Sequence, residues 1–362
     1  MVKIVNNCYL CSGMTVYFYH TQDTRWILDQ WEQGHFPAHL LYGATHLPQY
    51  GIQVVPHLYG PVPANRRWRL TLLTTWRLLT CRQHFDAVYA TSFRGLEGIV
   101  LLRAVGLWRR PVVLWHHQPI VKAANPLREA FARLFYRGID HMFFFSQPLI
   151  DVSLLSRKAR AASMQVVDWG ADLEFYGDLS QPLQKRGGFI STGKEMRDMH
   201  TLVEAFGRTG RRLDIHVSEQ AGSIDYRQVF GSLRVPPNVE VHLHNRLMVE
   251  ELARCVAQAD CVVICCRPSN YTVGLTTLVE ALALGLPVIA TRNTTFPFDI
   301  DREGVGLTVD YGDVDGWQQA IEYIATHPDD AKAMGQRGRR LAERRFNLIE
   351  TTRQVCKALE RL

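Results

Sequence analysis

The sequence predicts an α/β protein built from two Rossmann-like domains, each a doubly wound parallel sheet flanked by helices. Strand-like and helix-like patterns alternate over most of the chain, which is typical of this class. The length of 362 residues exceeds the usual size of a single core. A stretch rich in turn formers, YGDLSQPLQKRGG at 176–188, marks the expected boundary between the domains.

The first half contains three clear strand patterns and one helix pattern. The strands are DAVYATS at 86–92, PVVLWHH at 111–117 and HMFFFSQ at 141–147, each a short run rich in β-branched and aromatic residues. The helix pattern, GLEGIVLLRAVGL at 95–107, separates the first two strands. This succession predicts parallel strands joined by helical crossovers.

The second half restarts the same alternation. GFISTG at 188–193 reads as a strand and MHTLVEAFGR at 199–208 as a helix. CVVICC at 261–266 and VIAT at 288–291 read as buried strands, where cysteine behaves as a small apolar residue. Between them, apolar residues spaced by three and four positions predict a helix that begins after Gly274 and ends in Gly285-Leu286-Pro287.

The helix that begins after Gly274 carries one carboxylate, Glu280, among apolar residues. A glycine at a helix start leaves the first backbone N–H groups approachable, and with the helix dipole these groups attract phosphate. Glu280 lies about 8 Å further along the axis, at about 1.5 Å per residue, a distance comparable with that between a nucleotide's outer phosphate and its ribose. The spacing favours a nucleotide site; a solvent-exposed or ion-paired glutamate at a helix–sheet edge is the alternative.

Composition and charge narrow the class further. With 47% apolar and 21% charged residues the chain is of the globular type, and we expect neither a secretory signal peptide nor a membrane span. The net charge of +6 lies wholly in the first half, where residues 1–180 hold 18 Lys and Arg against 12 Asp and Glu. Its Arg and aromatic residues alternate in clusters such as NRRWRL at 65–70, which predicts contact with a membrane surface or an anionic acceptor. We therefore expect a cytoplasmic protein that can bind peripherally to the inner face of the cell membrane. No nucleic-acid-binding motif is present, so we expect no nucleic-acid partner.

Several segments resemble one known family, the GT-B glycosyltransferases, and in particular the retaining nucleotide-sugar transferases of family 4. LVEALALGLPVIAT at 278–291 matches the second half of that family's E-x7-E motif. STGKEMRDMHTLVEAF at 191–206 resembles the family's phosphate-binding segment, and VVDWGADLEFYGD at 166–178 resembles the segment before the second domain. The resemblance covers roughly residues 86–350. It implies an N-terminal acceptor domain at 1–180, a C-terminal donor domain at 181–345, and a last helix at 346–362 that packs back toward the first domain.

The resemblance also implies roles for residues of the second domain. Glu280 would hold the ribose hydroxyls, and Arg197 with Lys194 would neutralise the departing diphosphate, although Arg197-Asp198 also fits an ordinary helix start. The remaining donor-binding residues that it implies are Gly193, Arg246, Thr272, Gly274, Leu275, Thr276 and Thr277. No metal or other cofactor is implied.

In the first domain, PVVLWHHQP matches the family's P-V-V-x-x-x-H-D turn and places His117 beside the transferred sugar. His116 is one position away and is a candidate for acceptor binding, together with Tyr19, Trp26 and His35. The last three belong to a long aromatic segment, residues 6–37, which we interpret as replacing the family's first strand and glycine-rich loop. Packing is the alternative role for these aromatic side chains.

The predicted function is transfer of a hexose from a nucleotide sugar, a UDP-sugar first and a GDP-sugar second, to a saccharide or lipid-linked acceptor with retention. Synthesis of a bacterial surface glycan would suit it. Thr272 stands where the family has the first glutamate of its motif, so a degenerate transferase kept as a binding or partner protein is one alternative. A nucleotide-sugar epimerase or hydrolase on the same architecture is the other, but it requires a carboxylate pair that the sequence does not reveal.

Overall fold

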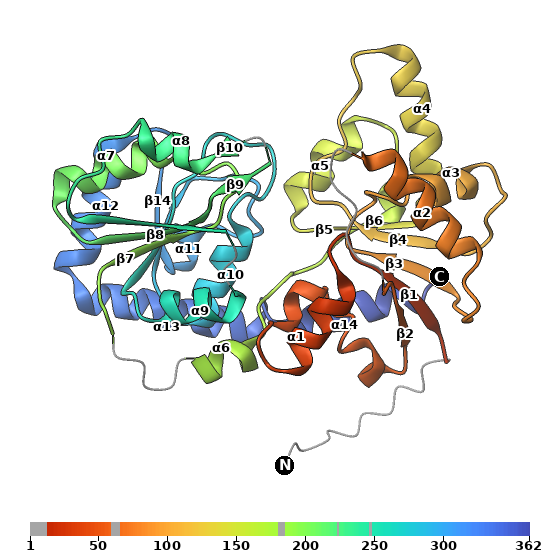
Figure 1. The fold of residues 1–362 in the computed structure, drawn as a ribbon, viewed down its shortest axis with the longest axis horizontal. Helices are drawn as coiled ribbons and strands as arrows, with labels where there is room; N and C mark the ends of the chain where they lie inside the picture. The colour runs from red at the N-terminus through yellow and green to blue at the C-terminus, as the bar shows by residue number, and fades with distance from the viewer. Residues whose placement is uncertain (1–12, 59–65, 180–184, 223, 246–247) are drawn as a thin grey trace. The chain divides into compact units, whose positions relative to one another are not determined.

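The fold was analysed in a computed structural model that describes residues 13–58, 66–179, 185–222, 224–245 and 248–362 (Figure 1). The chain forms two compact units. Unit 1 comprises residues 1–30, 40–167 and 349–362, and unit 2 comprises 31–39 and 168–348. The chain therefore passes between the units at four points. Compared with the domain expected at 1–180, unit 1 lacks residues 31–39 and 168–180, which belong to unit 2, and includes residues 349–362.

Unit 1 contains a six-stranded parallel sheet in the order β2-β1-β3-β4-β5-β6. Its strands are β1 Thr15–Tyr19, β2 Gln53–Pro56, β3 Ala87–Ala90, β4 Val112–Trp115, β5 His141–Phe144 and β6 Met164–Val166. Its helices are α1 Thr24–Glu32, α2 Arg67–Leu79, α3 Glu97–Ala104, α4 Pro126–Arg137, α5 Gln147–Leu155 and α14 Leu348–Leu359, with 3₁₀ turns η1 Ala38–Leu41, η2 Leu47–Tyr50 and η4 Ala161–Ser163. These bounds include residues of α1, η1 and α14 that the division assigns to unit 2.

The first strand of this sheet corrects the interpretation of the aromatic segment. Instead of replacing a strand, TVYFY forms β1, an interior strand of the sheet that pairs with β2 and β3. The rings of Tyr17, Phe18 and Tyr19 are buried on both faces. Aromatic residues favour β structure, and a central parallel strand covered by helices on both faces needs a continuous apolar run rather than alternation.

Unit 2 repeats the architecture with the order β11-β8-β7-β12-β13-β14, again all parallel. Its strands are β7 Phe189–Thr192, β8 Leu213–Ser218, β11 Val239–His244, β12 Cys261–Ile264, β13 Val288–Thr291 and β14 Gly306–Val309, with a small antiparallel pair, β9 Gln220–Ala221 and β10 Ile224–Asp225. Its helices are α6 Leu173–Leu179, α7 Met199–Thr209, α8 Tyr226–Gly231, α9 Val249–Ala257, α10 Leu275–Ala283, α11 Ile300–Glu303, α12 Val314–Thr326 and α13 Pro328–Arg344. The predicted two-sheet α/β fold is confirmed.

Each sheet reverses its winding direction once, and that point locates a ligand crevice. In unit 2 the strand order runs outward from β7 to β8 and β11, then returns to place β12 on the other side of β7. In unit 1 the corresponding reversal lies between β1 and β3. Open α/β sheets bind ligands beyond the carboxyl ends of the strands at such a switch point. The segments after β7 and β12, and those after β1, β3 and β4, are therefore the places to look for sites.

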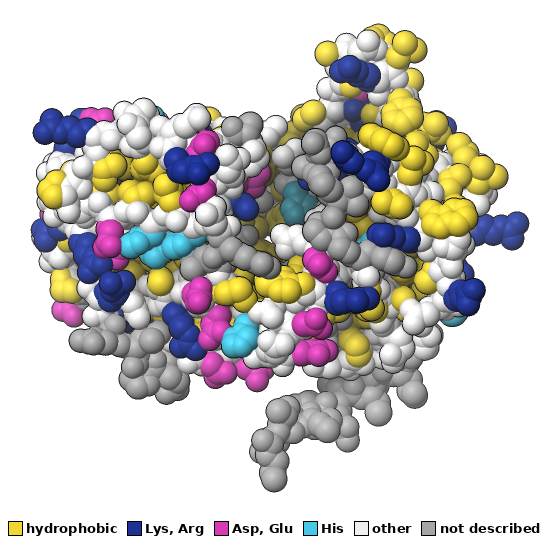
Figure 2. Space-filling model, in the orientation of Figure 1, with side chains coloured by type: hydrophobic (Ala, Val, Ile, Leu, Met, Phe, Trp, Pro, Cys, Tyr) yellow, Lys and Arg dark blue, Asp and Glu magenta, His cyan; other side chains and the backbone are white. Residues whose placement is uncertain are grey.

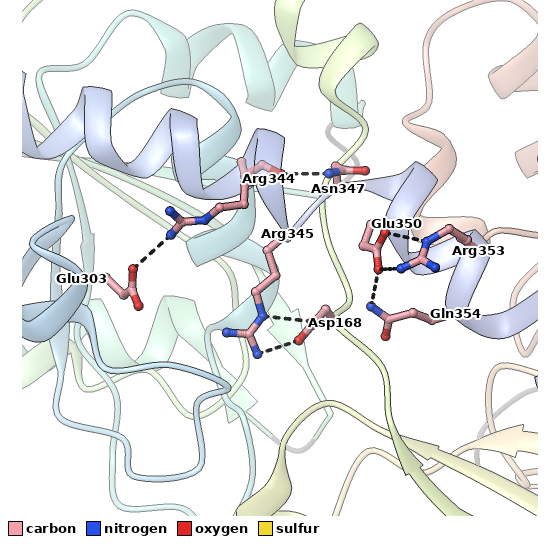
Figure 3. A network of polar contacts seen from close by, with 9 residues as sticks. Asp168, Glu303, Arg344, Arg345, Asn347, Glu350, Arg353 and Gln354 are labelled. Atoms are coloured by element: carbon pink, nitrogen blue, oxygen red, sulfur yellow. Dashed lines mark hydrogen bonds and ion pairs between the residues drawn. The ribbon is translucent and has the colours of Figure 1, made fainter. Parts of the chain in front are cut away.

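A polar network marks the segment where the chain passes from unit 2 to α14 (Figure 3). The Arg345 guanidinium forms a bidentate ion pair with Asp168, in which its Nε and one terminal nitrogen donate to the two carboxylate oxygens at 2.9 and 3.0 Å. The amide of Asn347 donates to the carbonyls of Ala342 and Glu343, which closes the end of α13. A Cβ on Gly170 would lie 1.8 Å from the Phe346 carbonyl carbon, so the backbone at Gly170 packs directly against the backbone at Phe346.

Candidate functional site

The start of α10 is open because of the conformation of Gly274. Its φ of +91° is left-handed, and a Cβ there would lie 2.5 Å from the Cγ2 of Ile264. Only glycine tolerates both conditions without strain. Thr276 is exposed in the first turn and Thr277 is buried beside it. The first N–H groups of the helix and these two hydroxyls form a donor-rich surface at the switch point of unit 2.

Arg197 lies against this surface and is buried, with 5% of its area exposed. Its guanidinium donates to the carbonyls of Thr192 and Glu195, to the Cys266 sulfur at 3.2 Å and to the Thr277 hydroxyl at 3.2 Å. No carboxylate of the described residues lies within ion-pair distance of it. A buried cation without an anion is costly, because neutral acceptors replace only part of its hydration. The site therefore favours an anionic ligand at the start of α10.

The turn after β7 holds Arg197 in place. Gly193 has a φ of +89°, and a Cβ there would lie 2.4 Å from an Arg197 terminal nitrogen. Met196 is also left-handed, with a φ of 51°. Backbone hydrogen bonds from Asp198 to the Cys265 carbonyl and from Arg267 to the Met196 carbonyl tie the turn to the end of β12. The Asp198 carboxylate caps α7, so the Arg-Asp pair serves as a helix start as well as placing Arg197 in the site.

Beside this turn lies a cavity of about 370 Å³. Its lining comes from the ends of β7, β8 and β11 and from α9, and consists of Gly193, Lys194, His216, Val217, Ser218, His244, Asn245 and Leu252. The Nδ1 of His216 lies 3.1 Å from the Nε2 of His244 and the two rings stack. Burial, then the charges of His242 and His244, lower the pKa of His216 to about 4, so its ring is neutral at pH 7. The cavity has the size and the apolar, aromatic lining that a heterocyclic base requires.

Glu280 is located five residues into α10, on its partly buried side. One oxygen lies 3.6 Å from the Nε2 of His39, a fully buried residue of the segment 31–39. Neither His39 ring nitrogen has a hydrogen-bond partner among the described residues, and the ring packs on Trp169 and Tyr176. Burial, and next the charge of Glu280 and a hydrogen bond to it, raise the pKa of the Tyr176 hydroxyl. These contacts fix the carboxylate from behind while 20% of its side chain stays accessible.

The other predicted donor residues lie around the same point. Leu275 is buried in the first turn of α10, and Lys194 is exposed at the rim of the cavity. Thr272 is buried just before Gly274, and its carbonyl accepts from the Leu275 N–H. Arg246 lies outside the described residues. The structure thus brings together the predicted residues of unit 2 that it describes.

In unit 1, His117 follows β4 at the carboxyl edge of the sheet and is exposed. Its Nε2 donates to the Thr91 carbonyl at 2.8 Å, which sets the tautomer. His20 follows β1 nearby. Burial lowers the pKa of His20, a hydrogen bond with the Leu40 backbone raises it in part, and the charge of His117 lowers it again, which leaves it at about 4. The ring of Tyr42 lies between them, 6.4 Å from His20 and 5.9 Å from His117. Two histidines from different strands therefore converge at the switch point of unit 1.

Two predicted acceptor residues have packing roles instead. Tyr19 is buried in β1, and its hydroxyl donates to the Arg94 carbonyl at 2.8 Å. His116 is also buried, with its ring nitrogens 2.5 Å from the Gln118 carbonyl and 2.9 Å from the Tyr136 hydroxyl. Successive side chains of a strand point to opposite faces, so His116 turns into the core when His117 faces out.

The remaining two acceptor candidates are separated in the structure. Trp26 is half-buried on α1 in unit 1. His35 belongs to unit 2, where its Nδ1 lies 2.5 Å from a Glu250 carboxylate oxygen. Both residues are expected to share one role because they lie in one aromatic segment, but the chain crosses between the units within that segment.

The sequence pattern of the family described as glycosyl transferases group 1 matches residues 222–341. An MMP alpha-(1→4)-mannosyltransferase from Mycolicibacterium hassiacum is 30% identical over 328 residues, which span 80% of this chain and 78% of the relative. The chain belongs to the glycosyl transferases group 1 family. A D-inositol 3-phosphate glycosyltransferase from Saccharomonospora viridis is 36% identical to this glycosyltransferase over 104 residues, 28% of the chain and 23% of that relative.

Solved structures agree with this glycosyltransferase in fold. Sucrose-phosphate synthase from Thermosynechococcus elongatus superposes with a TM-score of 0.72 at 14% identity, covering 97% of this chain and 99% of that one. Anabaena Alr3699/HepE in complex with UDP-glucose superposes with a TM-score of 0.65 at 15% identity, covering 96% and 100%. Both superpositions show that the two parallel-sheet units of the chain have the GT-B fold.

One group of side chains in the described part of the glycosyltransferase has the composition of a metal site. The ligating atoms of Asp214, Glu240 and His242 lie within 4.8 Å of one another. Arg212, however, hydrogen-bonds to both oxygens of Asp214, at 3.0 to 3.3 Å, and lies 3.8 Å from Glu240. The guanidinium thus pairs with Asp214 and lies near Glu240, so these side chains form an ion-pair network on the sheet.

Sequence reasoning missed four residues of the glycosyltransferase's sites: His20, His39, His216 and His244. A usable signal existed for the last two, since LDIHV at 213–217 and VEVHLH at 239–244 alternate apolar core residues with polar ones and so place His216 and His244 on the face opposite the main core. No pattern connects His39 with Glu280, because their contact joins segments 241 positions apart.

Proposed function

We propose that this glycosyltransferase moves a hexose from a nucleoside diphosphate sugar, a UDP-sugar first and a GDP-sugar second, with retention at the anomeric carbon. The observation that carries the proposal is Arg197, a buried guanidinium with no carboxylate partner among the described residues, directed at the start of α10. A diphosphate would supply the missing negative charge and would accept from the helix N–H groups at the same time.

The donor would extend from this point in two directions. Its ribose hydroxyls would donate to the Glu280 carboxylate, whose orientation is fixed by the His39 and Tyr176 contacts. Its base would occupy the cavity between Gly193 and the His216–His244 pair. One nucleotide thereby accounts for the buried cation, the accessible carboxylate and the cavity.

In the transfer step the bond between the anomeric carbon and the diphosphate oxygen breaks, and its electron pair stays on the phosphate. Arg197 and the N–H groups of α10 would stabilise that developing charge, with Lys194 at the rim. The acceptor oxygen would bond to the same face of the sugar and pass its proton to the leaving phosphate. This route needs neither an enzymatic base nor a bound metal, and we propose that transfer proceeds without one.

We infer the acceptor from unit 1 and from the relatives. His117, with its tautomer set by Thr91, would orient hydroxyl groups near the reacting carbon. The relatives named above are, by their names, an MMP alpha-(1→4)-mannosyltransferase and a D-inositol 3-phosphate glycosyltransferase. We propose a saccharide or lipid-linked saccharide acceptor, in the assembly of a bacterial surface glycan.

A thermal-shift panel of UDP- and GDP-sugars tests the proposal. A donor at about 100 times its Kd stabilises the folded state by about 2.7 kcal/mol, roughly 5–10 °C in Tm for a unit of this size. Glu280→Gln should reduce donor affinity about tenfold or more, because the ribose loses a charged acceptor. The matched control Glu343→Gln, at an exposed position of α13, should leave it unchanged. No shift with any nucleotide sugar would sink the proposal.

Thr272 supports a second candidate, a donor-binding protein with impaired transfer. It is buried before Gly274 and cannot supply the charge that the family's first glutamate would place there. Donor stabilisation without product formation over a panel of acceptors would favour this candidate.

A further inference from the structure

Unit 1 exposes large apolar side chains in an unusual concentration. Sixteen such side chains are exposed among the described residues, and ten of them lie within residues 66–137, about a fifth of the chain. Single exposed apolar residues are common on protein surfaces, but a cluster of this size marks an interaction site. The ten are Trp68, Leu72, Leu73, Trp76, Leu79, Val105, Leu107, Val121, Leu127 and Phe131.

Helix α2 carries apolar side chains on two opposite sides, one buried and one exposed. Leu70, Thr74 and Leu78 are buried against unit 1, while Trp68, Leu72 and Trp76 follow the opposite side at intervals of four residues. Trp68 and Trp76 each have 66% of their area exposed. Helix α4 repeats the pattern with Leu127, 81% exposed, and Phe131 one turn later. Two helices thus carry apolar stripes that nothing in the described structure covers.

The same segment is strongly basic. Residues 66–137 contain thirteen Lys and Arg against three Asp and Glu, so this segment is far more positive than the whole chain with its net +6. Two of the three acids are engaged, Glu97 with Arg67 and Glu129 with Lys158. Arg66 and Arg69, at the start of α2, and Arg128 on α4 are exposed and form no ion pair with any described residue. Positive charge therefore surrounds the apolar stripes.

These features share one side of the unit 1 sheet. Helix α3 packs between α2 and α4, and the right-handed crossovers β2-α2-β3, β3-α3-β4 and β4-α4-β5 all progress in the same direction along the sheet. Figure 1 shows the three helices on one side of that sheet, with α14 on the other. Figure 2 shows hydrophobic side chains gathered over α2–α4 with Lys and Arg side chains among them. We call this surface, formed by residues 66–137, the α2–α4 face.

We propose that the α2–α4 face docks on a bilayer containing anionic lipid, with Trp68, Leu72 and Trp76 in the interface and the arginines on the headgroups. Tryptophan and leucine in an in-plane helix flanked by arginine suit the boundary between headgroups and acyl chains. A second copy of the chain fits poorly, because a symmetric contact would oppose two strongly basic faces. No helix in the described residues is long and apolar enough to span a bilayer, so the contact would be peripheral.

Sedimentation with two kinds of vesicle tests the proposal: phosphatidylcholine alone, and phosphatidylcholine mixed with phosphatidylglycerol. The wild-type protein should sediment with the mixed vesicles, and more weakly at high salt. Arg66→Glu with Arg69→Glu changes the charge of the face by four units and should lower the partition coefficient by about a hundredfold or more, at roughly fivefold per unit. Trp68→Ser with Trp76→Ser should lower it at least about tenfold.

Matched controls lie elsewhere on the chain. Arg302→Glu with Arg340→Glu reverses two exposed charges of unit 2, and Ile349→Ser removes an exposed apolar side chain of α14. Both control variants should sediment as the wild type does. A Tm like that of the wild type, and an unchanged Tm shift with donor, will show that the test variants are folded and keep the donor site.

Three outcomes would overturn the proposal. They are no sedimentation with mixed vesicles, equal loss in the control variants, and sedimentation unaffected by the test variants. Concentration-dependent dimers that Trp68→Ser with Trp76→Ser abolishes, without vesicle binding, would assign the face to a second copy. Because donor binding is measured separately, failure of docking leaves the proposed transfer untouched, and failure of donor binding leaves docking untouched.

Discussion

The two units share one sheet architecture but differ in what fills their strands. The strands of unit 1 contain seven aromatic residues, among them Trp115 and Tyr89, whereas those of unit 2 contain one, Phe189. In unit 1 the buried aromatic groups are linked by hydrogen bonds, such as Trp115 Nε1 to the Tyr89 hydroxyl and that hydroxyl to the Tyr42 carbonyl. The core of unit 2 is mainly aliphatic. The same fold is thus stabilised by a polar–aromatic network in one unit and by aliphatic packing in the other.

Because of this difference, we expect the stability of the two units to depend on different solution conditions. Burial lowers the pKa values of three histidines in unit 1, His20, His57 and His116, to about 4, whereas in unit 2 it brings His216 to that value. Unit 2 instead contains the uncompensated cation of the donor site. We therefore expect unit 1 to respond to acid and unit 2 to respond to anions.

Acidification is expected to have the largest effect, on unit 1. A histidine whose folded pKa is lowered binds its proton more readily when unfolded, so its stability contribution is present above pH 6.5 and is lost as pH falls toward 4. At 1.36 kcal/mol per pKa unit, each of the three histidines could cost up to about 3 kcal/mol. Scanning calorimetry at pH 7 and pH 5 should show the unit 1 transition fall furthest, with the unit 2 transition identified by adding donor.

His57→Gln should remove part of this pH dependence, and His200→Gln, at an exposed position of α7, should not. Equal displacement of both calorimetric transitions between pH 7 and pH 5 would contradict the assignment of acid sensitivity to unit 1.

Replacing Arg197 is expected to lower donor affinity while leaving the stability of unit 2 equal or higher. Arg197→Met should lower donor affinity about a hundredfold or more, because a charge-assisted bidentate contact is lost. The same change should leave the Tm of the free protein equal or higher, since it removes a buried charge without a counter-ion. Titration calorimetry and thermal melts measure both, with Arg208→Met on the exposed side of α7 as control. A lower Tm together with unchanged affinity would show that Arg197 serves packing alone.

Gly274→Ala should destabilise unit 2 by about 2–3 kcal/mol, because a left-handed φ and a contact of 2.5 Å with Ile264 must both be relieved. Gly231→Ala offers a matched control, since its Cβ would meet nothing within 4 Å and its φ is not positive. Denaturant unfolding measures the change. Equal midpoints for the two variants would mean that the start of α10 adapts freely.

The smallest effect is expected at His39. His39→Phe keeps the ring packing on Trp169 and Tyr176 but removes the nitrogen 3.6 Å from Glu280. Donor affinity should fall by less than about tenfold, an effect on the order of 1 kcal/mol. A loss as large as that of Glu280→Gln would give His39 a direct contact with the donor, and no change in affinity would make it a packing residue.

Sequence alone predicted the fold, and it singled out most residues of the proposed donor site, because both depend on local patterns. Gly193, Arg197, Gly274 and Glu280 lie in two short segments next to strands β7 and β12, and parallel pairing of these strands brings the segments together. The resemblance of residues 86–350 to one family covers both segments. Unit 1 was harder to predict, since TVYFY as a strand and TVYFY as an aromatic loop have the same composition. Burial alone distinguishes them.

Contacts between distant segments account for the rest of what the sequence did not reveal. His35 was expected beside Tyr19 and Trp26, yet it pairs with Glu250 in unit 2. The docking face was predicted only as a basic tendency, because the exposure of Trp68 and Trp76 depends on which side of α2 packs inward.

The four crossings of the chain between the units bear on how the protein is made. Residues 31–39, which complete unit 2 beside Glu280, leave the ribosome long before that helix, and α14, which completes unit 1, is nearly the last segment to be synthesised. Neither unit can close its core until almost the whole chain is available, so vectorial, unit-by-unit folding during translation is not open to this protein. An excised unit 2 beginning at Asp168 would lack His39, the histidine beside Glu280, the carboxylate proposed to bind the ribose.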